Sequence, residues 1–167
     1  MKKRGAARFI TRAGVVAALY VVLTYLTTLC GLANGAVQFR ISEMLCILPV
    51  FIFEAVPGLT IGCLIANTVS GGLAVIDIVF GTVATLIGAL GAYFLRKLPP
   101  RLIWLATLPN ILANTFILPP VILYAYGSEY GYWLTTLFIF ISQLLAAGIG
   151  GTALYPVIKK SRLDTLM

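Results

Sequence analysis

Long apolar stretches, separated by short polar or glycine-containing segments, occupy most of the chain. They cover residues 13–33, 44–70, 78–95, 102–125 and 133–158. A helix needs about 20 apolar residues to cross the hydrocarbon core of a bilayer, so four of these stretches suit a single crossing. The 44–70 stretch is longer, and Glu54 interrupts it just before Pro57 and Gly58, a pair that ends helices. We therefore expect this stretch to form two helices.

This pattern predicts an all-α membrane protein, a six-transmembrane-helix bundle that forms one integral domain over residues 1–167. The helices are expected at about 10–32, 41–54, 57–70, 77–97, 102–125 and 133–158. At about 1.5 Å per residue the second and third helices are shorter than the roughly 30 Å hydrocarbon core. Loops are expected to fill the remaining outer part of the bundle, because non-helical backbone is tolerated there only when it is buried or lines a cavity.

Positive charge is distributed unevenly along the chain. Of the 12 Lys and Arg residues, all but Arg40 lie near the two chain ends or between the fourth and fifth expected helices. Six crossings place all of these residues on one side, which the excess of basic residues identifies as the cytoplasm. Both termini are therefore expected to be cytoplasmic, with Arg40 and Asp77 on the outer side.

Composition supports a multi-pass protein of the cell membrane. Hydrophobic residues make up 60% of the 167 positions and charged residues 10%, against about a quarter charged in typical soluble chains. The net charge of +7 follows the cytoplasmic segments and does not indicate nucleic-acid binding. The chain has no His, no Cys-x-x-Cys pair and no phosphate-binding P-loop. We therefore predict no enzyme activity, no metal site and no cofactor bound by this chain.

Polar residues are rare in the outer half of the expected bundle, where they are costly unless they are paired or functional. The candidates for ligand binding are Gln38, Arg40, Glu43, Asn67, Asp77, Asn114 and Gln143. A small polar ligand rich in hydrogen-bond donors fits this set better than a bare ion, since rings of charge for ion selectivity are not visible.

Several of these residues also have a purely structural interpretation. Glu43 would either accept two donors from a ligand or pair with Arg40, one helical turn away. Asp77 would either bind the ligand or cap a helix. Asn110 and Asn114 lie four residues apart on one helix face and can hydrogen-bond to neighbouring helices. Aromatic residues within 124–133 match an interfacial belt, although one or two rings could stack on a flat ligand.

Small residues recur at four-residue spacing on the first expected helix. Ala13 with Ala17 and Gly14 with Ala18 form two overlapping pairs. Such pairs allow close helix approach in lipid. Packing inside the bundle and contact with another protein both remain open from this pattern.

Several segments carry a family resemblance over nearly the whole chain. They include Ala-Leu-Tyr-Val-Val-Leu-Thr at 18–24, Gln-Phe-Arg-Ile-Ser-Glu at 38–43, and the stretches 57–67 and 77–86. In these segments the chain resembles the substrate-binding S components of the energy-coupling-factor (ECF) transporters. The resemblance is greatest to their queuosine-precursor group, QueT, and the 38–43 run is its most specific part.

The resemblance implies a membrane subunit that captures a 7-deazaguanine queuosine precursor, or queuine, from outside. Glu43 would accept the guanine-like N–H pair, and Asp77 would be a second acceptor. Ala13 and Ala17 would face the coupling helices of a transmembrane T subunit, and two cytoplasmic ATPases would use ATP to drive transport. Some members carry a carboxylate where this chain has Gln143, and an amide cannot neutralise a cationic aminomethyl group. Cyano, aminomethyl and queuine-type ligands therefore all remain open.

Three other functions remain open from the residues. The first is an S component for another vitamin-like cargo, which a ligand screen would distinguish. The second is a self-sufficient small secondary transporter or channel, which would move substrate into liposomes without ATPases. The third is an intramembrane enzyme using Glu43 and Asp77 as an acid pair, which is disfavoured because no His, metal motif or base-activated nucleophile accompanies them.

Overall fold

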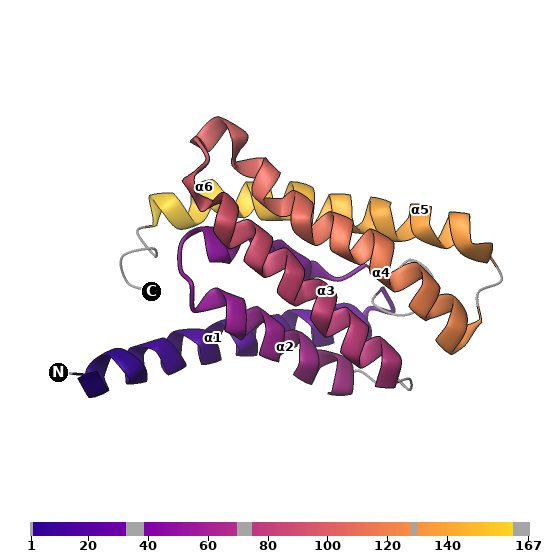
Figure 1. Cartoon of the computed structure of the whole chain (residues 1–167), viewed down its shortest axis with the longest axis horizontal. Helices are drawn as coiled ribbons and strands as arrows, with labels where there is room; N and C mark the ends of the chain where they lie inside the picture. Colours follow the sequence, from indigo (N-terminus) through magenta and orange to yellow (C-terminus); the bar gives the residue numbers. More distant parts are fainter. Residues whose placement is uncertain (1, 33–38, 70–74, 128–129, 162–167) are drawn as a thin grey trace.

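A computed structural model of the chain describes residues 2–32, 39–69, 75–127 and 130–161. The described part is almost entirely helical, and its helices form an elongated bundle (Figure 1). The α-helices are α1 (Lys2–Leu29), α2 (Ala55–Val69), α3 (Val75–Phe94), α4 (Leu108–Tyr126), α5 (Gly131–Gln143) and α6 (Gly151–Lys160). Shorter 3-10 segments are η1 (Ile41–Val50), η2 (Leu95–Lys97) and η3 (Pro100–Thr107), and η4 (Leu144–Gly150) is a π-helical segment.

The six expected helices correspond to six helical segments. Four of them are long and apolar enough to cross a membrane: Gly5–Leu29, Val75–Lys97, Pro100–Ala125 and Gly131–Lys160. The other two, η1 and α2, are shorter apolar helices. The 44–70 stretch is broken as expected, but the break lies between Val50, where η1 ends, and Ala55, where α2 begins. Pro57 and Gly58, which were expected to end a helix, lie in the first turn of α2, where proline is tolerated.

Both boundaries of the first expected helix differ from the sequence-based prediction. Helix α1 begins at Lys2 and not near residue 10, because the basic leader is rich in Lys, Arg and Ala, which favour helix. It ends at Leu29 and not at residue 32, because Gly31 adopts a left-handed backbone with φ of 72°. The amides of Gly31 and Leu32 then donate to the carbonyls of Thr28 and Thr27, which closes the helix in a Schellman motif.

The second expected helix, 41–54, is a 3-10 helix that stops at Val50. A 3-10 helix rises about 2.0 Å per residue, so ten residues reach about as far as the longer α-helix that was expected. Helix η1 is packed against α1, α2, α3, α6 and η4, and most of its residues, including Pro49, are buried. Irregular backbone within a membrane-embedded bundle is tolerated when protein encloses it, as it is here.

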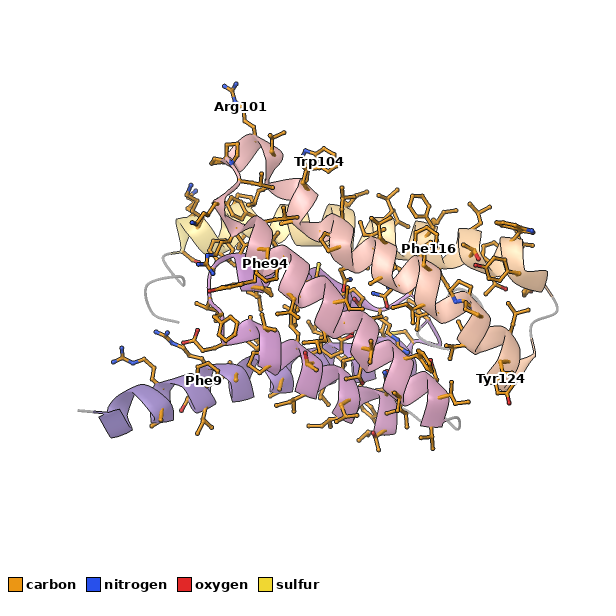
Figure 2. All side chains as sticks on the ribbon, in the orientation of Figure 1. Phe9, Phe94, Arg101, Trp104, Phe116 and Tyr124 are labelled. Atoms are coloured by element: carbon orange, nitrogen blue, oxygen red, sulfur yellow. The ribbon has the colours of Figure 1, made fainter. Side chains whose placement is uncertain are left out.

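The basic segments gather at one end of the bundle. Figure 1 shows the start of α1, the end of α6 and the turn between α3 and α4 all at its left-hand end. Arg101 lies in that turn and points away from the bundle (Figure 2). At the same end, Arg12 of α1 and Glu54, just before α2, form an ion pair with a nitrogen–oxygen distance of 2.9 Å. The opposite end is formed by the start of α3, the end of α4 and the start of α5.

Helices α1 and α2 approach each other closely along a seam of small residues. A Cβ on Gly58 would lie 2.8 Å from the carbonyl oxygen of Ala13, and one on Gly62 would lie 2.9 Å from that of Ala17. Ala13 and Ala17 are each only 8% exposed. They pack inside the bundle in this conformation, and their expected contact with a T subunit stays a prediction.

This seam makes a prediction for stability. A methyl group on Gly62 would meet backbone atoms of α1, so we expect Gly62→Ala to destabilise the protein by about 1–3 kcal/mol. Gly14→Ala is the matched control, because a Cβ there meets nothing within 4 Å in the described structure and alanine favours helix. Thermal unfolding in detergent measures both variants. Equal unfolding temperatures would contradict the close approach of α1 and α2.

Candidate functional site

The carboxylate of Glu43 is the centre of a buried polar network. Glu43 lies in the first turn of η1. The hydroxyl of Tyr20 on α1 donates to its Oε1 atom at 2.6 Å, and the side-chain amide of Asn110 on α4 donates to its Oε2 atom at 2.8 Å. Beside it, Thr24 of α1 donates to the hydroxyl of Ser42 at 2.7 Å, which fixes the start of η1 against α1. Glu43 is therefore held between three elements of the bundle.

Arg40 precedes η1 in an extended conformation and contacts α2. Its Nη1 atom donates to the Oδ1 atom of Asn67 at 2.7 Å. The structural alternative for Glu43, a direct pair with Arg40, is therefore not what forms: Arg40 bonds to Asn67, and Glu43 bonds to Tyr20 and Asn110. The guanidinium still interacts electrostatically with both Glu43 and Asp77. These three groups together carry a formal charge of −1, which favours a donor-rich or cationic ligand over an anion.

Helices α4 and α5 contribute three amide side chains to the same region. The Nδ2 group of Asn110 donates to Oε1 of Gln143 at 3.2 Å in addition to its bond with Glu43. One turn further along α4, Asn114 donates to the backbone carbonyl of Asn110 at 2.9 Å. Gln143 is the last residue of α5, immediately before the π-helical segment η4. One amide group of Asn110 thus connects η1 with the end of α5.

Two glycines of α3 make room for the amides of its neighbours. A Cβ on Gly81 would lie 2.9 Å from Nδ2 of Asn67, and one on Gly88 would lie 2.4 Å from Oδ1 of Asn110. These glycines lie seven residues apart, two turns on one helix face. Asn67 from α2 and Asn110 from α4 therefore rest directly on the backbone of α3. This close contact keeps both amides in place beside the charged groups.

The structure brings most of the predicted site residues together. Arg40, Glu43, Asn67, Asn114 and Gln143 belong to the hydrogen-bonded groups described above, and Asp77 lies within electrostatic reach of Arg40. Gln38 lies outside the described residues. Asp77 is the third residue of α3 and not its N-cap, because the helix begins at Val75. Its carboxylate remains in the first turn, where the helix dipole favours negative charge.

Sequence reasoning missed two residues that touch Glu43 directly. Tyr20 lies in an apolar helix, and an isolated Tyr there resembles any packed aromatic residue. Asn110 has a recognisable signal, its four-residue spacing from Asn114, but its position nearer the cytoplasmic side left it out of the predicted set. Both are 1% exposed. Their hydrogen bonds to one carboxylate show that the polar network extends deeper than the outer rim.

The surface outside the network is apolar. Trp104, Phe116 and Tyr124 lie on the outside of the bundle (Figure 2), and Trp133 is also exposed. Such outward positions suit a lipid-facing aromatic belt. A groove of about 530 Å³ lies between α3 and α4, and its lining, which includes Phe80 and Pro120, is almost entirely apolar. This groove offers few partners to a polar ligand, unlike the region around Glu43.

The fold and the network define a class: a small, all-helical protein with four helices long and apolar enough to span a membrane and a buried polar network between them. The comparison with known proteins is more specific. Residues 10–160 match the family model described as the QueT transporter, and the chain belongs to this family. The queuosine precursor transporter QueT of Lactococcus lactis subsp. cremoris (strain MG1363) is 39% identical over 87 residues. That match covers 52% of this chain and 50% of the relative, so it spans about half the length of each. No solved structure matches the chain.

Proposed function

We propose that this chain is the substrate-binding membrane subunit, or S component, of an ATP-driven ECF importer. It captures a 7-deazaguanine queuosine precursor, or queuine, from outside the cell and delivers it to the cytoplasm. Membership of the QueT transporter family and the name of its Lactococcus relative support this proposal. It acts as a transport protein of the cell membrane and not as an enzyme.

The observation that carries the proposal is the buried carboxylate of Glu43. Each of its oxygens already accepts one internal hydrogen bond and retains further acceptor capacity. A guanine-like edge offers two adjacent N–H donors, which suit a carboxylate held in a fixed orientation. Asp77 is proposed as a second acceptor. Arg40, Asn67, Asn114 and Gln143 provide the remaining polar lining, together with Gln38 from the undescribed segment.

The transport assembly requires further subunits. The sequence has no P-loop, so ATP is proposed to be hydrolysed by two cytoplasmic ATPases that act through a transmembrane T subunit. We place both chain ends and the 97–101 turn in the cytoplasm, with six crossings in total. The segment from Ala13 to Ala18 is proposed to contact the T subunit. In the present conformation its exposed small residues are Gly14 and Ala18.

Ligand-induced stabilisation tests the proposal. We expect 7-cyano-, 7-aminomethyl-7-deazaguanine or queuine to raise the unfolding temperature of the detergent-purified chain. A ligand that binds only the folded state stabilises it by about 2.7 kcal/mol at a hundredfold excess over its Kd. Guanine, riboflavin, thiamine and biotin are the comparison compounds. Stabilisation by one of the vitamins alone would keep the transporter class and reject the cargo, and no stabilisation of a folded preparation would reject the proposed ligand.

A further inference from the structure

The orientation of the Asn110 side-chain amide is determined by the residues around its oxygen and its nitrogen. Its Oδ1 atom is buried, has no hydrogen-bond partner in the described structure, and rests against the backbone of Gly88. Its Nδ2 group faces two acceptors, Oε2 of Glu43 at 2.8 Å and Oε1 of Gln143 at 3.2 Å. A flipped amide would place its oxygen against both acceptors and leave them without a donor. Glu43 and Gln143 therefore impose one orientation on Asn110.

This orientation has a consequence for Gln143. A side-chain amide carries its oxygen and its nitrogen on opposite sides, and Asn110 engages the oxygen of Gln143. The Nε2 donor of Gln143 is consequently turned away from Asn110. Glu43, in contrast, is kept as an acceptor by Tyr20 on one oxygen and Asn110 on the other. The two residues next to Asn110 thus present opposite hydrogen-bonding character.

We propose that Asn110 is a positioning residue that sets the hydrogen-bond polarity of the site, fixing Glu43 as an acceptor and Gln143 as a donor. This inference rests on the proposed function, in which Glu43 takes the guanine-like edge. That edge is common to all 7-deazaguanines, so the group left for Gln143 is the variable 7-substituent. A donor at Gln143 favours a substituent that accepts a hydrogen bond, such as a nitrile. Tyr20 donates to Glu43, and no hydrogen bond joins it to Gln143 among the described residues.

Two variants separate these roles. Tyr20→Phe removes one donor from Glu43 and leaves the contact between Asn110 and Gln143 in place. Asn110→Leu has nearly the same shape as the native residue and removes the donor that both acceptors share, without adding charge. Thr115→Val is the matched control, because its hydroxyl is buried on the same helix but donates only to the carbonyl of Ile111. The probes are 7-cyano-7-deazaguanine and 7-aminomethyl-7-deazaguanine.

We expect Tyr20→Phe to weaken binding of both probes equally, by about tenfold, because a hydrogen bond to a charged group is lost. Asn110→Leu is expected to weaken binding of both probes. It is also expected to change the ratio of the two dissociation constants by about tenfold, because the nitrile ligand loses more affinity than the aminomethyl ligand. Thr115→Val keeps both the affinities and the ratio. Titration calorimetry in detergent measures all three variants beside the unmodified chain.

The outcomes distinguish this inference from the proposed function. If the unmodified chain binds neither probe, the proposed function fails. If it binds them and Asn110→Leu keeps the native ratio, Asn110 does not set polarity and the inference is overturned. If Asn110→Leu does not fold, Gln143→Leu decides, because the inference assigns the donor to Gln143: an unchanged ratio of the two dissociation constants overturns it, and a larger loss for the nitrile ligand supports it.

Discussion

Replacing Glu43 with Gln is expected to lower the affinity for 7-deazaguanine ligands by about a hundredfold. The substitution keeps the size of the side chain but removes its charge and one of its two acceptor oxygens. Hydrogen bonds to a charged group contribute about 1.5–3 kcal/mol each, and about 2.7 kcal/mol corresponds to a hundredfold change in Kd. The new amide group would also face Tyr20 or Asn110, which both donate to Glu43 in the native protein.

The matched control for this prediction is Glu54→Gln. Glu54 is a carboxylate that is less buried than Glu43 and is paired with Arg12 at the basic end of the bundle. Removing its charge tests whether the loss of any buried carboxylate disturbs binding through general destabilisation. Titration calorimetry of both variants against the same ligand gives the comparison. A Glu43→Gln variant that binds like the native chain would show that Glu43 is a structural residue, held by Tyr20 and Asn110 for packing alone.

The broad architecture could be predicted because it depends on local chemistry. The apolar stretches, the presence of a break within residues 44–70 and the grouping of basic residues each follow from a few neighbouring residues. The 3-10 geometry of Ile41–Val50 could not be predicted in the same way, because the same apolar residues also suit an α-helix. Its form depends on the helices packed around it, which enclose its backbone.

The residues of the polar network could be predicted from the sequence better than the hydrogen bonds between them. Arg40 and Glu43 were recognised because charges near a membrane-embedded helix are costly. Their hydrogen-bond partners are distant in sequence: Arg40 donates to Asn67, and Glu43 accepts from Asn110. Because Arg40 and Glu43 lie three residues apart, the sequence indicated that their side chains could pair with each other. Only the packing of α2 and α4 against Gly81 and Gly88 brings the competing amides into range.

The glycines of α3 therefore have a role that their sequence spacing alone does not specify. Small residues at intervals along a membrane helix usually indicate close helix packing. In this chain the close approach also makes room for polar side chains, because Asn67 packs against Gly81 and Asn110 packs against Gly88. Helix α3 thus contributes to the site mainly through its backbone surface, while its neighbours contribute the hydrogen-bonding groups. Asp77 adds the acidic side chain of α3 to the same region.

Arg40→Met is expected to destabilise the chain by about 3 kcal/mol, because it leaves nearby carboxylates without their cation. Arg40 interacts electrostatically with Glu43 and Asp77 and donates to Asn67 at 2.7 Å, so methionine removes the nearby cation from both carboxylates and a donor from the Asn67 oxygen. Arg40→Lys keeps the charge and should recover part of the lost stability. Chemical denaturation in detergent, followed by the fluorescence of Trp104 and Trp133, measures the free energy of unfolding.

Arg12→Met separates this electrostatic effect from the loss of any ion pair. Arg12 and Glu54 are partly exposed, and such pairs contribute about 0–1 kcal/mol, so this control should remain close to the native stability.

The same variants also test the charge balance of the site. Without Arg40 the remaining carboxylates carry a formal charge of −2, so the relative affinity should shift toward the cationic aminomethyl ligand and away from the neutral nitrile. If Arg40→Met is no less stable than Arg12→Met and keeps the native preference, Arg40 does not balance the charge of Glu43 and Asp77.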